Sequence, residues 1–313
     1  MAFKAQGLQT ILRADSIGSL AARTLHNGSK VIGKVTNTFP NSFYVQTFDD
    51  ELLFVTNRSL KSPITINLDS KSNLDGAVKP LQRITIQSNT LLIGNDTCIA
   101  LDTAAVSGQP KALRQSKFNA QSGQIGKALY DAILILNIVD TKQSVLDKRG
   151  LVHKAAAEFA ERVSISLRAA NTDGEFKETA QGLIGLGFGF TPSGDDMLGG
   201  FLATYNSFAS NFGRPQILME PALLQRKTSW ISAKLLDYMQ RLVVDDQVSH
   251  MISSAAAGDR DQLILAFEDL LPRGHTSGID ISVGAILALG LIQDMALKEK
   301  ETEFLRSSLG LVS

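Results

Sequence analysis

Hydrophobic residues in the first third of the chain come in short runs that polar turn residues interrupt. Between about Lys30 and Thr103 the runs are rich in β-branched and aromatic side chains, and Asn, Asp, Gly and Pro separate them. Many short strands joined by tight turns predict an antiparallel β sandwich or a barrel-like domain. We assign residues 1–120 to this β-rich domain and expect a short helix near its N-terminus.

The hydrophobic spacing changes to a helical period after a polar connector at residues 107–124. Good helix formers then recur near Ile125–Ile138, Leu151–Ala170, Phe176–Ile184, Asp195–Phe208, Thr228–Val243, Asp245–Ala257, Asp259–Leu271 and Asp280–Leu297. The C-terminal half should therefore be a mostly α-helical domain, which we place at residues 121–313. The whole pattern indicates an α+β protein of two domains.

Two glycine-rich motifs lie where a loop gives way to one of these helices. The first is GLGFGFTPSGDDMLGG at residues 185–200, and the second is RGHTSGIDISVGA at residues 273–285. Both contain Ser, Gly, any residue, Asp, three residues and Gly, so that Gly200 and Gly284 follow Asp196 and Asp280 by four residues. Residues four apart share a helix face, and a glycine there lets two helices cross closely. Such a crossing would bring the two helix N-termini together.

Each motif has a structural and a functional interpretation. Ser193 and Ser277 are natural N-caps, and Ser-x-x-Asp is close to a capping box that serves the helix alone. Capping does not explain the glycines at alternate positions before Ser193, because glycine in ordered backbone costs about 1 kcal/mol. Glycine-rich loops before helices bind anions through convergent N–H groups and the helix dipole. A small substrate that carries phosphate or carboxylate would suit such a site.

The candidate residues follow from this anion-site hypothesis. His275 is suited to proton transfer near neutral pH, and Arg273 is suited to a bidentate grip on an anion. The candidate catalytic residues are His275, Asp196 and Asp280. The candidate substrate-binding residues are Gly187, Gly189, Thr191, Ser193, Gly194, Asp195, Arg273, Thr276, Ser277 and Gly278.

Other ligand chemistries fit the motifs less well. The first motif has no Lys after its glycines, so it is not the phosphate-binding loop of nucleotide hydrolases, and it lacks the dinucleotide-binding pattern. We expect no cofactor, although Asp195, Asp196 and Asp280 together would suit a divalent metal. Carboxylates at helix N-termini are favoured by the dipole even with nothing bound. In the β-rich part, Asn37, Asn41 and Ser42 surround a turn that would reach a site, but a plain turn explains them as well.

Composition removes several function classes. The 31 basic and 31 acidic residues balance, which argues against a general binder of nucleic acid or anionic membranes. The lone Cys98 cannot form an internal disulfide and is expected to be buried. The N-terminus lacks the layout of a signal peptide, and the most apolar stretch, Ile281–Ile292, is shorter than a membrane span. These features predict a cytoplasmic protein.

Taken together, the two motifs resemble those of the family that contains the AllH-type subunit of oxamate carbamoyltransferase. The resemblance includes the stretches VTNTFPNSFYVQ, SPITINL and TSWISAKLL, and it covers most of residues 30–291. The familiar form of the first motif has proline where this chain has Phe188. The resemblance implies exchange of a carbamoyl group between oxalurate and phosphate, which yields oxamate and carbamoyl phosphate, in purine and allantoin nitrogen catabolism. It also implies different partner subunits, and a homo-oligomer remains open.

Two alternatives remain open at this point. One is a metal-dependent hydrolase that uses Asp195, Asp196 and Asp280. The other is a noncatalytic assembly subunit in which the Gly and Asp residues serve only helix packing. Fold alone does not separate these alternatives, because function resides in the site.

Overall fold

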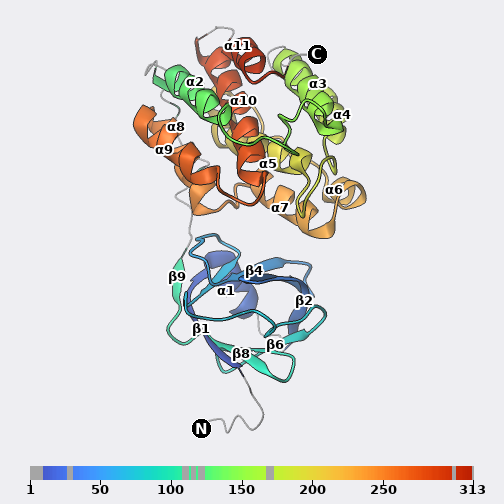
Figure 1. The fold of residues 1–313 in the computed structure, drawn as a ribbon, viewed down its shortest axis with the longest axis vertical. Helices are drawn as coiled ribbons and strands as arrows, with labels where there is room; N and C mark the ends of the chain where they lie inside the picture. The colour runs from blue at the N-terminus through green and yellow to red at the C-terminus, as the bar shows by residue number, and fades with distance from the viewer. Residues whose placement is uncertain are drawn as a thin grey trace. The chain divides into compact units, whose positions relative to one another are not determined.

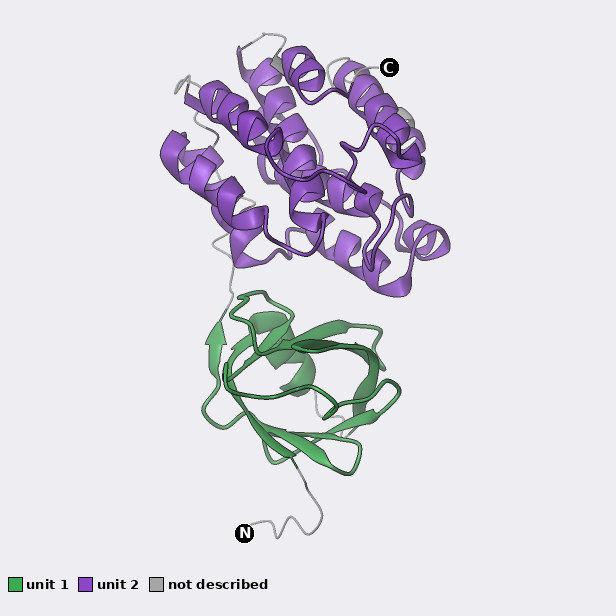
Figure 2. Ribbon diagram, viewed as in Figure 1, with its two compact units in different colours: residues 1–111 green, residues 112–313 purple. Residues whose placement is uncertain are grey.

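The computed structural model describes residues 10–26, 31–107, 113, 118, 124–166, 173–297 and 301–311. The chain divides into two compact units, Met1–Lys111 and Ala112–Ser313, which Figure 2 shows in different colours. Each unit has its own hydrophobic core. The two units are described separately.

The described residues of the first unit form nine strands and one short helix. The helix is α1 (Ser19–His26), as the sequence predicts. The strands are β1 (Thr10–Gly18), β2 (Val31–Phe39), β3 (Ser42–Thr47), β4 (Leu52–Thr56), β5 (Thr65–Leu68), β6 (Arg83–Gln87), β7 (Thr90–Ile93), β8 (Thr97–Ala100) and β9 (Ala105–Ser107).

Eight of these strands close into a barrel. The strand order is β5-β4-β3-β2-β6-β7-β8-β1, and β1 pairs back onto β5. On its other edge β1 pairs first with β8 and then with β9, which continues that edge. The barrel alternative is therefore confirmed, but the antiparallel prediction is wrong in part. β1 lies parallel to β8 and β9, because it inserts between strands distant in sequence to complete the closure. β4 also lies parallel to β5.

Alternating side chains of the strands fill the barrel. In β3, for example, Phe43 and Val45 are buried, whereas their neighbours are only half-buried. Leu25 of α1 joins this core. The predicted burial of Cys98 in β8 is confirmed, and burial raises the pKa of its thiol.

The second unit is helical. Its elements are α2 (Gln124–Leu136), α3 (Leu151–Ser166), α4 (Asp173–Gln181), α5 (Ser193–Phe208), the 3-10 helix η3 (Ala209–Phe212), α6 (Pro221–Lys227), α7 (Trp230–Gln240), α8 (Asp246–Ala257), α9 (Arg260–Leu270), α10 (Ser277–Leu297) and α11 (Glu301–Ser308). All eight predicted helical segments contain a helix. The additional helices α6 and α11 are too short to show a clear hydrophobic period.

Helices α5 and α10 lie side by side at the centre of this unit (Figure 1). Every residue of α5 is buried, and so are residues 278–294 of α10. By length and composition α10 would also pass as a membrane span, but 89% of its most apolar window is buried inside the unit. That burial is typical of a core helix. Both central helices begin within the glycine-rich motifs.

Candidate functional site

The two motif helices touch backbone to backbone. A Cβ atom added to Gly200 would lie 2.2 Å from the carbonyl oxygen of Ile281, and one added to Gly284 would lie 1.9 Å from that of Met197. No side chain fits at such distances, so only glycine permits this approach. The predicted close crossing of α5 and α10 is thus confirmed.

The crossing brings the openings of the two motifs together. Thr191 Oγ1 lies 3.3 Å from Ser277 Oγ, and Ser193 Oγ lies 3.5 Å from Thr276 Oγ1. Thr191 also donates a hydrogen bond of 2.8 Å to Asp196 Oδ2. The hydroxyl groups of Thr191 and Ser193 from the first motif therefore lie beside those of Thr276 and Ser277 from the second motif, at the start of both helices. We call these four residues the hydroxyl cluster.

Two buried carboxyl groups lie against the hydroxyl cluster. Burial raises the pKa of Asp196 to about 6, although hydrogen bonds from Ser277 and Thr191 and the charge of Arg273 act in the opposite direction. Burial raises the pKa of Asp280 to about 8, and the charge of Asp196 raises it further. The two carboxyl groups therefore affect each other. Paired acids with displaced pKa values are common at functional sites.

Asp195 lies on another side of α5. Its Oδ1 accepts the N–H of Gly185 at 2.7 Å, and its Oδ2 accepts the hydroxyls of Thr228 and Ser232. Burial raises the pKa of this carboxyl, and the same hydrogen bonds lower it. These contacts tie the glycine loop to the start of α7. Asp195, predicted to bind substrate, is occupied by structural hydrogen bonds.

The alternating glycines shape the loop before α5. Gly185, Gly187 and Gly189 all have positive φ, at 80°, 112° and 104°, which side-chain-bearing residues rarely adopt. A Cβ on Gly187 would also lie 2.7 Å from the backbone nitrogen of Ser193. The loop therefore folds over the start of α5. Phe188 at its tip is 69% exposed.

Several backbone N–H groups that the anion hypothesis needs are already bonded within the protein. Gly194 donates to Leu186 O at 2.9 Å, and Gly278 donates to Arg273 O at 3.0 Å. The N–H groups of Asp195, Asp196 and Asp280 also bond to backbone carbonyls. A Cβ on Gly194 or Gly278 would clash with a carbonyl oxygen, at 2.2 and 2.0 Å. These two glycines allow close backbone packing, and their contact with a substrate stays a prediction.

The predicted N-cap role of Ser193 is wrong. Pro192 occupies the N-cap position of α5, and no side chain caps that helix end. Ser193 is the first helical residue, and its hydroxyl donates to the carbonyl of Gln143 at 2.9 Å. The serine therefore joins α5 to the loop after α2 rather than capping its own helix.

His275 and Arg273 lie in the turn before α10 but differ in environment. His275 is exposed. Arg273 forms an ion pair with Asp245, which is 7% exposed and caps α8 by accepting the N–H of Val248. The ion pair orients the guanidinium group, and its charge still reaches Asp196. A ligand would thus meet an arginine that is already held in place.

Sequence reasoning missed the loop that follows α2. The N–H of Val145 donates to Asp280 Oδ1 at 2.8 Å, and the carbonyl of Gln143 accepts from Ser193. Gln143 has a φ of 66°, which is uncommon for a residue with a side chain. No motif marks these residues, because their role depends on contacts distant in sequence.

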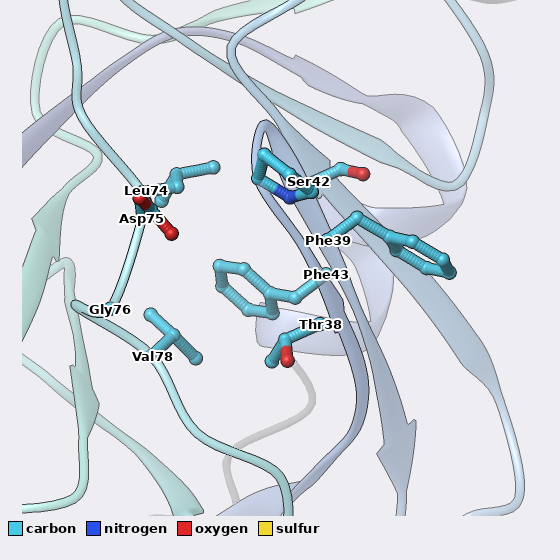
Figure 3. A pocket seen from close by; sticks show the side chains of 9 residues that line it. Thr38, Phe39, Ser42, Phe43, Leu74, Asp75, Gly76 and Val78 are labelled. Carbon is cyan, nitrogen blue, oxygen red and sulfur yellow. The ribbon is translucent and has the colours of Figure 1, made fainter.

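The barrel has a separate hollow of about 190 Å³ near the turn between β2 and β3. Figure 3 shows Phe43 facing the segment that carries Leu74 and Val78, with Ser42 at the turn. The carbonyl of Asn41 accepts bonds from Asn57 and Thr56, so this turn is fixed to β4. Ser42 lines the hollow, whereas Asn41 serves the turn itself.

Two family models match the chain. The model described as oxamate carbamoyltransferase subunit AllH matches residues 183–289, and the model described as the AllH family N-terminal domain matches residues 12–106. Together they cover most of the chain, including both motifs and all nine strands in full or in part. No curated protein and no solved structure matches it.

Proposed function

The chain belongs to the AllH family of oxamate carbamoyltransferase subunits, and we propose on this basis that it is a subunit of a carbamoyltransferase for small anionic substrates. The proposed substrates are oxalurate and phosphate, or oxamate and carbamoyl phosphate in the reverse direction. The proposed setting is purine and allantoin nitrogen catabolism in the cytoplasm. Because the family name describes a subunit, a multi-subunit complex is expected.

One observation supports this proposal above the others, namely the meeting of the two motifs at the crossing of α5 and α10. Hydroxyl groups from both motifs lie within 3.5 Å of each other there. Arg273 adds a positive charge that is fixed by Asp245. Hydroxyl donors, a guanidinium group and two helix N-termini favour a negatively charged ligand.

In the proposed reaction an oxygen of phosphate attacks the carbamoyl carbon of oxalurate. The bond from that carbon to the oxamate nitrogen breaks, and the proton of hydrogen phosphate ends on this nitrogen. We assign Asp196 as the acceptor of the phosphate proton, because a pKa of about 6 suits a base near neutral pH. The exposed His275 is assigned as the donor to the leaving nitrogen. Water then carries the proton from Asp196 to His275, which resets both groups, so that overall the nitrogen gains the proton that phosphate loses.

The attack passes through an oxyanion on the carbamoyl carbon. Thr191 and Ser277 bond to Asp196 in the free protein, and we propose that their hydroxyl groups turn to this oxygen once Asp196 has accepted the phosphate proton. Arg273 lowers the energy of the oxyanion through its charge. Fixed donors of this kind typically contribute about 10²–10³-fold in rate. The glycine loop with Phe188 at its tip is proposed to limit the access of water.

A noncatalytic assembly role is the second candidate. The observation that favours it is that five motif N–H groups bond to the protein's own carbonyls, while Asp195 is held by three hydrogen bonds. The hydrolase alternative has less support. Within the part of the chain that the structure describes, no group of three His, Cys, Asp or Glu side chains is placed to hold a metal ion.

An assay of carbamoyl transfer by the complete enzyme distinguishes a catalytic role of this subunit from a noncatalytic assembly role. We expect His275→Ala to reduce the rate of carbamoyl phosphate formation at least about tenfold, given the usual contribution of acid–base groups, without weakening subunit assembly. His26→Ala, at an exposed histidine in the barrel unit, is the matched control and should keep full activity. Full activity of His275→Ala would contradict the assigned role, and no transfer by the complete wild-type enzyme would contradict the proposed function.

A further inference from the structure

The loop between α2 and α3, residues 137–150, is bonded to the starts of both motif helices. The carbonyl of Gln143 accepts the hydroxyl of Ser193 in α5 at 2.9 Å. The N–H of Val145 donates to Asp280 Oδ1 in α10 at 2.8 Å. This loop lies outside the residues that either family model matches, so the family comparison gives it no role.

Val145 is fixed by hydrogen bonds on both of the peptide groups that flank it. On one side its own N–H reaches the carboxyl group of α10, and the carbonyl of Ser144 accepts the N–H of Asp147 at 3.1 Å. On the other side the N–H of Leu146 donates to Ser144 Oγ at 3.1 Å, and the carbonyl of Val145 lies 2.9 Å from Nδ1 of His153. Because Ser144 and Val145 are fully buried, these bonds set the direction of the Val145 N–H.

His153 holds the carbonyl of Val145 from the start of α3. A carbonyl oxygen only accepts hydrogen bonds, so Nδ1 of His153 must carry a proton. The ring is half-buried, and the backbone N–H of His153 bonds to the carbonyl of Gly150 at 3.2 Å. The histidine therefore ties Val145, and with it the N–H that faces Asp280, to a helix.

The part of the loop that meets α5 is anchored by a second side chain. Gln143 has a φ of 66°, and its N–H donates to Asp147 Oδ2 at 3.1 Å. Asp147 also pairs with Arg149 at 3.0 Å, and the bonds from Arg149 and Gln143 hold the pKa of Asp147 well below its usual value. This carboxylate thus stays ionised and keeps the Gln143 carbonyl directed at Ser193.

We propose that His153 is a positioning residue of the candidate site, which acts through Val145 to hold the carboxyl group of Asp280 beside the hydroxyl cluster. The N–H of Val145 favours the charged form of Asp280, whereas burial and the charge of Asp196 favour the neutral form. The histidine therefore sets the pH at which a second negative charge appears in the site. The inference rests on the proposed function only for the effect on the reaction, because the placing of Asp280 is measured without substrate.

The other charged and titratable groups of the elements around Asp280 stay the same in every variant used below. The charge of Asp196 acts on Asp280, and the charge of Arg273 acts on Asp196. The groups are Asp195 and Asp196 of α5, Arg273 and His275 of the turn before α10, and Asp140, Lys142, Asp147, Lys148 and Arg149 of the loop. A change in the pKa of Asp280 in a His153 variant therefore reports on the Val145 N–H.

The test follows the carboxyl carbon of Asp280 by NMR in the full-length protein, with Asp280→Asn to assign its signal. The wild type should titrate near pH 8. In His153→Phe, which keeps a ring but has no donor, Asp280 should bind its proton at least about threefold more tightly, because it loses a directed hydrogen bond. In His153→Asn the side-chain amide replaces the donor, so the titration should stay close to that of the wild type.

His250→Phe, at another half-buried histidine of the helical unit, is the matched control and should leave the titration of Asp280 unchanged. An unchanged titration in His153→Phe, or an equal change in the control, would overturn the proposal. A measurement on the wild type covers the case in which His153→Phe does not fold. Nitrogen NMR of the neutral His153 ring should find the proton on Nδ1, and a proton found on Nε2 instead would overturn the proposal.

The consequence for the reaction is measured in the complete enzyme. In the wild type, the KM for phosphate should rise as pH passes through about 8, because ionised Asp280 adds a negative charge that repels the anion. This rise should move to higher pH in His153→Phe but not in His153→Asn, while the ionisation of phosphate itself is the same in all three. Identical KM profiles would contradict the positioning role, whereas no transfer by the wild type would count against the proposed function and leave the NMR result standing.

Discussion

At the residue scale, neighbouring aspartates of the first motif have different roles. Asp195 bonds to Gly185, Thr228 and Ser232, whereas Asp196 faces Thr191 and the second motif. Consecutive residues of a helix point about 100° apart, so they cannot both face one ligand. The motif spacing was sufficient to predict which acids approach each other. It could not predict the bonds of Asp195 to Thr228 and Ser232, because these two residues lie more than 30 positions further along the chain.

The raised pKa values predict how stability depends on pH. Asp196 and Asp280 hold their protons more tightly in the folded state, with pKa values of about 6 and about 8. Their stabilising contribution is fully present below the unfolded pKa of about 4 and is lost as pH rises through the folded values. The free energy of unfolding should thus fall between about pH 4 and pH 8.

The difference between wild type and Asp280→Asn isolates one of these groups. The asparagine variant should lose less stability than the wild type as pH rises towards 8, while Asp195, Asp196 and Arg273 remain in place. Urea unfolding at several pH values measures this difference. A pH dependence identical in both proteins would contradict the displaced pKa of Asp280.

At the element scale, the contact between α5 and α10 depends on two glycines four residues after the motif acids. The repeated spacing predicted this contact, because a helix face can be derived from sequence alone. The barrel shows the limit of such reasoning. Its strands β2–β8 were recognised as short hydrophobic runs, but β1 was not assigned as a strand. β1 closes the barrel, and its role is defined by pairing with β5, β8 and β9 rather than by its own pattern.

Adjacent glycines of α5 provide a matched test of the crossing. A Cβ at Gly200 would meet the backbone of Ile281, which cannot move without separating the helices. A Cβ at Gly199 would meet the flexible side chain of Met239 at 2.6 Å. Gly200→Ala should therefore lower the free energy of unfolding by at least about 1–3 kcal/mol, and Gly199→Ala should change it by less than about 1 kcal/mol. Equal effects in denaturant titrations would contradict the backbone contact.

At the scale of the whole molecule, each family model matches residues within one compact unit. The change from short β-rich runs to helical spacing predicted this two-part organisation. The hydroxyl cluster and both buried acids lie in the helical unit, so the proposed chemistry needs only residues of that unit. The loop of Gln143 and Val145 could not be predicted, because its place beside α5 and α10 results from packing of the unit as a whole.

The central claim is that both motifs contribute to one anion site. Calorimetric titration of the protein with carbamoyl phosphate, in the presence of its partner subunits, tests this claim on wild type, Thr191→Val and Ser277→Ala. The account predicts binding by the wild type and weaker binding, by about tenfold, for either variant, because each loses one hydroxyl of the same site. Phe48→Ser, at an exposed barrel residue, should bind like the wild type. Unchanged affinity in both variants, or a loss confined to one of them, would contradict a shared site.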